Sequence, residues 1–269
     1  MTMDIARYSE SLRSYDFDGL KKIKQESIPK KLYKYVPLGL SPSEDEKRFK
    51  TLESTSLWFS PVSEYNDTNE FQGLYVSDRK LAEEGWSPDH IFGIHEIVEA
   101  IGGKALVCCL SAVGYDNEPM WAYYANNSRG YCIEYKVDDP RYLREVQYES
   151  CAREITHTAA SLYCNTLNNL KTHKLTNEDR ASLELISMRT QIKHSSWNHE
   201  KEYRFVIPVD LSEGVSMTIS ELGLSVCCVY AGVGCEEGDF DRMRGIGEEL
   251  GFPVEKLEPF DLGFRSSCH

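Results

Sequence analysis

The chain has 269 residues, of which 41% are hydrophobic and 27% are charged, proportions typical of a soluble globular protein. Its 43 Asp and Glu residues outnumber its 30 Lys and Arg residues, and the net charge of −13 argues against general nucleic-acid binding. The first residues lack the basic end and apolar run of a secretion signal, and no apolar run reaches membrane-spanning length. We therefore expect a cytoplasmic protein that does not associate with a membrane.

No linker rich in Pro, Gly or Ser interrupts the chain. We predict a single α+β domain over residues 31–269, preceded by an N-terminal helical extension over residues 1–30. The 9 cysteines include no Cys-x-x-Cys pair, which zinc sites commonly use. Buried, reduced thiols are therefore expected.

In the first half, apolar residues at helical spacing predict helical structure within residues 1–27, and β-favouring residues predict a strand at 32–36. Ser43 and Glu46 predict a capping box that begins a helix continuing through Leu52. The next predicted elements are a strand at 57–60, a loop at 61–70, a helix ending at Gly102 and Gly103, a strand at 105–110 and a short helix opened by Asn117 and Pro119.

In the second half, two long helices are predicted at 151–170 and 177–195, the second with Asn177 as its N-cap. An acidic helix is predicted at 236–250, and strands at 131–137, 146–148, 201–208, 216–219, 225–231 and 253–257. Strands follow one another both directly and across helices. This pattern favours an α+β fold, with a mixed or antiparallel sheet core and flanking helices, over a doubly wound sheet.

The strand after Trp197 is the most informative segment. Side chains alternate across a strand, so its apolar and charged residues separate onto two faces: Tyr203, Phe205 and Ile207 on one, and Glu200, Glu202 and Arg204 on the other. The apolar face belongs to a core. The charged face either meets water or looks into a cleft.

The sequence contains no glycine-rich dinucleotide motif, no phosphate-binding Gly-Lys-Ser/Thr loop, no His-Glu-x-x-His and no Gly-x-Ser-x-Gly. Aromatic and polar residues gather instead at 33–35, 58–70, 120–130 and 197–204. A planar, base-bearing ligand would need aromatic faces to stack on and carboxylates to accept its hydroxyl and amide hydrogens. An aromatic core edged by polar residues would give the same pattern.

These four segments resemble the successive motifs of a bacterial family, domain of unknown function 2971 (DUF2971). The motifs are Leu32-Tyr-Lys-Tyr35, Leu57-Trp-Phe-Ser-Pro61 with Tyr65-Asn-Asp67 and Glu70, Met120-Trp-Ala-Tyr-Tyr124 with Gly130-Tyr-Cys-Ile-Glu-Tyr135, and Trp197 with Glu200, Glu202 and Arg204. They follow in order over about residues 30–260. The resemblance implies a bacterial or phage-associated intracellular protein, but no reaction.

A second resemblance does imply a reaction. Glu200-Lys-Glu202 is similar to the Glu-x-Glu signature of ADP-ribosyltransferases, and Ser54-Thr-Ser56 with Phe59-Ser60 is similar to their Ser-Thr-Ser strand. Lys34 stands at the first-strand position where that superfamily carries Arg or His. The resemblance implies an ADP-ribosyltransferase-like split sheet and a glycosyl transfer from NAD that releases nicotinamide, in anti-phage defence or as a toxin.

In that reaction Glu202 would hold the ribose hydroxyl and stabilise positive charge developing on the sugar. Glu200 would orient or deprotonate the acceptor, and Tyr65 would stack on nicotinamide. The other residues expected to bind NAD are Lys34, Tyr35, Ser60, Asn66, Asp67, Trp121, Tyr124 and Arg204. NAD is expected as a substrate and no metal is expected, while the macromolecular target is left open.

Two alternatives use the same residues. In a binding module that recognises a nucleotide or phage component, Glu200 and Glu202 would be neutralised by arginines such as Arg204. In a metal-dependent nuclease, Asp67, Glu70, Glu200 and Glu202 would hold the metal ion. The nuclease ranks last because the net charge opposes its substrate.

Overall fold

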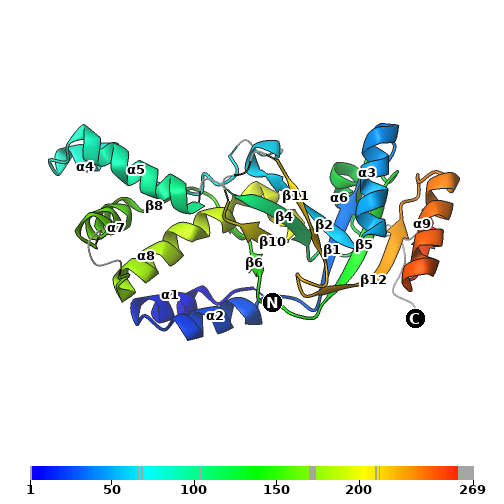
Figure 1. The fold of residues 1–269 in the computed structure, drawn as a ribbon, viewed down its shortest axis with the longest axis horizontal. Helices are drawn as coiled ribbons and strands as arrows, with labels where there is room; N and C mark the ends of the chain where they lie inside the picture. The colour runs from blue at the N-terminus through cyan, green and yellow to red at the C-terminus, as the bar shows by residue number, and fades with distance from the viewer. Residues whose placement is uncertain are drawn as a thin grey trace.

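The computed structural model describes residues 2–65, 67, 69–102, 105–169, 174–209, 211 and 213–259. As predicted, the chain has an α+β fold with a mostly antiparallel sheet and flanking helices (Figure 1). Within the described ranges the helices are α1 Ile5–Arg13, α2 Phe17–Glu26, α3 Pro42–Glu53, α4 Asp78–Glu83, α5 Pro88–Gly102, α6 Glu118–Tyr124, α7 Thr156–Asn169, α8 Asn177–Ser187 and α9 Glu237–Leu250, with 3₁₀ turns η1 Val62–Glu64, η2 Met188–Gln191 and η3 Ser195–Glu200.

The main sheet has nine strands. The strands of the described chain are β1 Lys31–Val36, β2 Ser56–Pro61, β3 Leu74–Tyr75, β4 Leu106–Ser111, β5 Tyr131–Val137, β6 Leu143–Glu145, β7 Gln147–Glu149, β8 Arg153–Glu154, β9 Ile192–His194, β10 Glu202–Ile207, β11 Val215–Thr218, β12 Leu224–Ala231 and β13 Val254–Lys256. Strands β3 and β8 form one small parallel pair, and β7 and β9 form another.

The main sheet divides at β4. Its order is β11-β2-β4-β1-β5-β12-β13, and β10 pairs with β4 and with β6. One edge of β4 pairs with β10 along the whole strand. Two strands share the other edge of β4. Strand β2 pairs with its first two residues, Leu106 and Val107, and β1 pairs with its last residue, Ser111. Between these two contacts the sheet has a gap beside Cys109.

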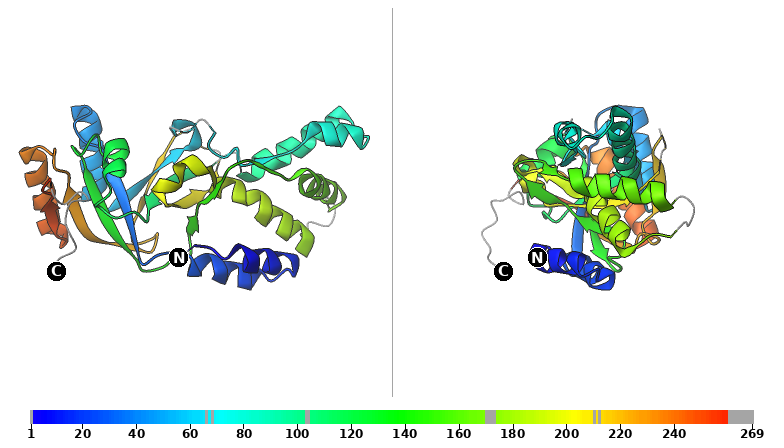
Figure 2. Two further views of the ribbon diagram at one scale, coloured as in Figure 1. Left: turned by 180° about the vertical axis from the view of Figure 1, so that it is seen from behind. Right: turned by 90° about the vertical axis from the view of Figure 1, so that its left-hand side faces the viewer.

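Two large hydrophobic clusters lie at opposite ends of the molecule (Figures 1 and 2). The first packs one face of the sheet against α3 and α9, around buried residues such as Phe49, Phe59 and Met243. The second is formed largely by helices α1, α2, α5, α7 and α8, around residues such as Leu20, Ile94 and Ile186. None of the described helices has the length and hydropathy needed to cross a bilayer.

Two predicted helix starts were wrong. Helix α3 is capped by Ser41, whose side chain accepts from the Glu44 amide, and not by Ser43, because Pro42 already occupies the first turn. Helix α8 is capped by Thr176, which forms a capping box with Asp179, so the predicted N-cap Asn177 lies inside the helix. The predicted cap of α6, Asn117, is confirmed by its bond from the Met120 amide.

Two predicted helices were too long. The helix predicted at 151–170 begins only at Thr156, because residues 153–154 form β8. The helix predicted at 177–195 ends at Ser187, and the chain then turns through η2 into β9. Strand β9 pairs in parallel with β7, so tertiary pairing outweighs the helical pattern there. The short elements β3 and α4 were not predicted.

Gly130 sits where α6 returns into β5. A Cβ at this position would lie 1.9 Å from the Val36 carbonyl oxygen and 2.9 Å from the Pro37 Cα. Backbone atoms cannot yield as a flexible side chain can. This contact therefore fixes how closely α6 approaches the end of β1.

We expect Gly130→Ala to lower the free energy of unfolding by about 2 kcal/mol or more, because the added methyl group forces the backbone apart. The control is Gly245→Ala in α9, where a Cβ meets no described atom within 4 Å. That change should raise stability by roughly 0.5–1 kcal/mol. Urea denaturation measures both, and equal midpoints for the two variants would contradict the assigned contact.

Candidate functional site

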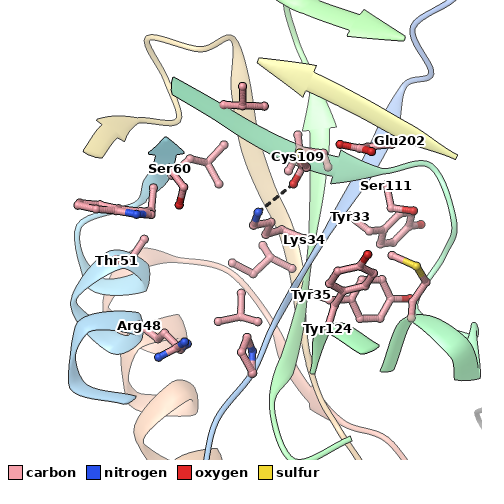
Figure 3. A pocket seen from close by; sticks show the side chains of 18 of the residues that line it. Tyr33, Lys34, Tyr35, Arg48, Thr51, Ser60, Cys109, Ser111, Tyr124 and Glu202 are labelled. Atoms are coloured by element: carbon pink, nitrogen blue, oxygen red, sulfur yellow. Dashed lines mark hydrogen bonds between the residues drawn. The ribbon is translucent and has the colours of Figure 1, made fainter. Parts of the chain in front are cut away.

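A cavity of about 1020 Å³ opens at the divided part of the sheet (Figure 3). Lys34 of β1, Ser60 of β2, Tyr65 after η1 and Glu202 of β10 all line it. The sequence segments around residues 34 and 202 are thus neighbouring walls of one cavity. Its volume is at the upper end of the range usual for small-molecule sites.

Lys34 occupies the gap in the sheet. Its Nζ donates to the Cys109 carbonyl at 2.9 Å (Figure 3). The Tyr65 hydroxyl donates to the Val107 carbonyl at 2.9 Å. These side chains satisfy β4 carbonyls along the edge that β1 and β2 share. Burial opposes the charged form of Lys34, but the neighbouring Cys108, Cys109 and Glu202 groups outweigh it and raise its pKa.

Arg204 and Glu202 form a buried bidentate pair beside the cavity. Arg204 Nε lies 2.7 Å from Glu202 Oε1 and Nη2 lies 3.0 Å from Oε2, while Nη1 donates to the Thr190 carbonyl at 2.8 Å. Both side chains project from the same face of β10, and Arg204 is 0% exposed. The apolar face, with Tyr203 and Phe205, packs in the sheet core as predicted. The charged face therefore does not meet water.

Lys193 of β9 joins the pair to two more carboxylates. Its Nζ lies 2.7 Å from Glu200 Oε2, 3.1 Å from Glu202 Oε2 and 3.8 Å from Glu70 Oε2. Three glutamates and two cations thus form one buried cluster, which we call the charge cluster: Glu70, Glu200, Glu202, Lys193 and Arg204. Burial disfavours the ammonium of Lys193, but the carboxylates raise its pKa.

Glu70 is the least satisfied member of the charge cluster. Its Oε1 lies 2.6 Å from Arg204 Nη2, yet neither of its carboxylate oxygens accepts a well-aligned hydrogen bond from the described residues. Burial raises its pKa, although Arg204 and Lys193 act in the opposite direction. Glu70 also lines the cavity. Its carboxylate oxygens could therefore accept hydrogen bonds from a ligand bound there.

Glu200 reaches the charge cluster from a different element than expected. It ends η3, and Lys201 then adopts a left-handed conformation with φ 44° before β10 begins. Glu200 therefore does not share a strand face with Glu202. The two carboxylates meet at Lys193 instead, and the Tyr124 hydroxyl donates to Glu200 from α6. The Tyr148 hydroxyl accepts from the Glu202 amide at 2.8 Å.

The position between the three carboxylates is filled by the Lys193 ammonium. No cluster of three or more His, Cys, Asp or Glu residues suited to a metal ion occurs in the described part of the chain. A divalent ion bound by Glu200 and Glu202 would have to displace Lys193. The ammonium of Lys193 already neutralises part of the negative charge of these two carboxylates. This donor set does not fit a metal-dependent nuclease.

Most residues predicted for the site line the cavity: Lys34, Tyr35, Ser60, Tyr65, Asp67, Tyr124, Glu200 and Glu202. Trp121 does not, because it is 1% exposed, packs edge-on against Tyr35 and donates to the Tyr115 carbonyl at 2.6 Å. Arg204 does not line the cavity itself, but it pairs with Glu202 and Glu70, which do. Asn66 lies outside the described residues.

Sequence reasoning missed Lys193, which it assigned to a helix. Its position between Ile192 and His194, shortly before Trp197, was the available signal, because the indole lies 4.9 Å below the Lys193 Nζ. Glu70 was predicted only as a metal ligand of the nuclease alternative, and not among the residues expected to bind NAD. The sequence also did not identify the cations of α3 that line the opposite wall, Lys47, Arg48 and Lys50.

Residues 120–205 match the model of a family described as "Protein of unknown function (DUF2971)". Over this segment the chain is similar to DUF2971. This match confirms the predicted resemblance over those residues, and the segment runs from α6 into β10. It contains four members of the charge cluster, whereas Glu70 and Lys34 precede it. No curated protein and no solved structure matches the chain.

The charge cluster predicts a specific dependence of stability on pH. Burial alone would raise the pKa of Glu202, but Arg204 and Lys193 lower it from 4.5 to about 2. A carboxyl group with a lowered pKa in the folded state contributes stability that is complete above its unfolded value and is lost as the pH falls through its folded value. Glu202 should therefore contribute on the order of 3 kcal/mol above pH 4.5 and lose it toward pH 2.

We expect Glu202→Gln to be less stable at neutral pH, with a smaller loss of stability on acidification than the unmodified protein shows. Urea denaturation at about pH 7, 5 and 3 measures this difference. Glu83→Gln is the control, because Glu83 is an exposed carboxylate in a surface pair with Arg79. Parallel pH profiles for Glu202→Gln and the unmodified protein would contradict the assigned pairing.

Proposed function

We propose that the cavity binds a nucleotide of the NAD type and that the protein acts as a binding module. The carrying observation is that the cavity carboxylates are held by internal cations, Glu202 by Arg204 and Glu200 by Lys193. A carboxylate fixed in this way keeps acceptor lone pairs for ligand hydroxyl or amide groups. Such a wall suits recognition of a ribose or a carboxamide.

The opposite wall supports binding of phosphates. Helix α3 contributes Lys47, Arg48 and Lys50 to the cavity lining. Their carboxylate partners Glu44 and Glu46 are themselves partly exposed, so these cations can contact a ligand in addition to their helix neighbours. Figure 3 shows Arg48 on α3, across the cavity from Glu202, with Lys34 between them. The two ends of the cavity therefore differ in charge, as the two ends of a nucleotide do.

Aromatic side chains supply surfaces for a base. Trp58 of β2 lines the cavity and is 49% exposed, although an indole of this size is usually buried. Trp197 lines it from η3, with His199 at a ring-centroid distance of 6.0 Å. Stacking on such rings is insensitive to which base is present. Selection between different nucleotides would come from Glu200 and Glu202, which accept hydrogen bonds from the ligand.

We expect calorimetry to detect saturable binding of NAD, and Arg48→Gln combined with Lys47→Gln to weaken it about tenfold through loss of phosphate contacts. Arg79→Gln is the matched control, because Arg79 is an exposed arginine on α4 that pairs with Glu83 and does not line the cavity. Equal affinity in the cavity variant and the control, or no binding of NAD, ADP-ribose or AMP, would contradict the proposal.

A second candidate function is glycosyl transfer from NAD by an ADP-ribosyltransferase-like reaction. The observation that favours it is that Lys34, Ser60, Tyr65 and Glu202 line one cavity, as the resemblance implies. In that step the bond between the ribose C1′ and nicotinamide breaks, and its electron pair leaves with nicotinamide. The acceptor oxygen then bonds to C1′ and gives its proton to Glu200, while Glu202 stabilises the positive charge on the sugar.

If the reaction occurs, purified protein should release nicotinamide from NAD, and Glu202→Gln should reduce the rate by at least about a hundredfold. Chromatography of nicotinamide measures release, and calorimetry on the same samples measures binding. Binding of NAD without nicotinamide release, alone and with cell extract as a source of acceptor, would support the binding module. Unchanged release by Glu202→Gln would remove Glu202 from the mechanism.

A further inference from the structure

A second cleft, of about 580 Å³, lies at the helical end of the molecule. Helix α2 forms one wall, α8 forms the other, and residues around β6 contribute Arg141 and Arg144. Figures 1 and 2 show α2 running below α8 from both sides of the molecule. The cleft shares no lining residue with the cavity at β4.

This cleft has the opposite charge to the chain as a whole. Its described lining residues include five basic side chains and one carboxylate, whereas the whole chain carries −13: Lys21, Lys24, Arg141, Arg144, Arg180 and Glu184. Five cations gathered in one concavity repel one another. Such a concentration of positive charge in an acidic protein indicates an anionic ligand.

The single carboxylate is already engaged. Glu184 pairs with Lys24 and also accepts from the Tyr8 hydroxyl at 2.8 Å. Arg141 pairs with Asp139, which does not line the cleft. The cleft therefore contains no carboxylate for its other cations.

Arg144 and Arg180 are the cleft arginines that form no ion pair with a described carboxylate. The Arg144 Nη1 donates to two backbone carbonyls, of Arg141 and Leu143, at 2.8 Å each, and the described residues include no carboxylate within 4 Å of it. The Arg180 guanidinium lies over the Phe17 ring at 4.1 Å, with no carboxylate of the described chain in ion-pair contact. A guanidinium that stacks on a ring keeps its edge donors for an anion.

This arrangement has an electrostatic cost, because two of the cations have lowered pKa values. Burial lowers the pKa of Arg144, which is half-buried, although Glu184 acts against it. Burial also lowers the pKa of Lys24, and the charge of Arg144 adds to that effect, although Glu184 acts against it. A multiply charged anion in the cleft would offset both effects, because its negative charge favours the charged forms of Lys24 and Arg144.

We propose that this cleft is a binding site for a compact polyphosphate, carried by a nucleotide or free. The cations converge on one concavity, so they match several phosphates linked closely together. The chain is otherwise strongly acidic, so an extended nucleic-acid strand leaving the cleft would meet repulsion. The guanidinium forks of Arg144 and Arg180 suit bidentate contacts to phosphate oxygens.

Calorimetry with tripolyphosphate, ATP and a single-stranded oligonucleotide tests this site on the full chain. We expect tripolyphosphate to bind, and Arg144→Gln with Arg180→Gln to weaken it at least about tenfold, with an affinity that falls as salt rises. If ATP binds more tightly than tripolyphosphate, the natural ligand is the polyphosphate group of a nucleotide. If the two bind equally, the ligand is free polyphosphate.

The control is Lys22→Gln, whose side chain is 74% exposed on α2 next to Lys21 but does not line the cleft. If Arg144→Gln fails to fold, exposed Lys21 and Arg180 are replaced instead. Binding of NAD at the other cavity should be unchanged in these variants, which separates the two sites. Absence of polyphosphate binding, equal binding by variant and control, or tighter binding of the oligonucleotide would overturn the proposal.

Discussion

The guanidinium of Arg204 has no contact with solvent, so its charge must be balanced inside the protein. Glu202 provides two aligned acceptors, Thr190 provides a carbonyl and Glu70 adds a second negative charge. These partners come from β10, η2 and the segment after η1, so one buried cation fixes the relative positions of three parts of the chain. The wall of the cavity at β4 depends on that arrangement.

Lys193 extends the same constraint to Glu200 and Tyr124. An ammonium is a compact charge with three donors, and here it bonds two carboxylates that approach from η3 and β10. Helix α6 joins through the Tyr124 hydroxyl. Removing either cation would leave buried carboxylates facing one another, which costs more than an ion pair of this kind contributes. The charge cluster is therefore a single unit, and its members do not act independently.

Local patterns predicted much of the fold. The alternation of Tyr203 and Phe205 identified the core face of β10, and Asn117 marked the start of α6, because both signals depend on residues close in sequence. The pattern could not show that β9 pairs with β7, since strand pairing between distant segments leaves no local periodicity. The same limit explains the missed Lys193. Its role is set by Glu200 and Glu202 after the chain has folded, and the residues next to it in the sequence, Trp197 included, do not specify those two partners.

The division of the sheet at β4 also determines which parts of the cavity can yield. Among the described strands, β1 and β2 each bond to β4, but no backbone ladder joins them to each other. The bond from Lys34 to the Cys109 carbonyl lies in the opening between them. Across its width the cavity is therefore held by side-chain contacts such as the Lys34 bond, whereas its wall at β10 is held by a backbone ladder to β4 and by the charge cluster.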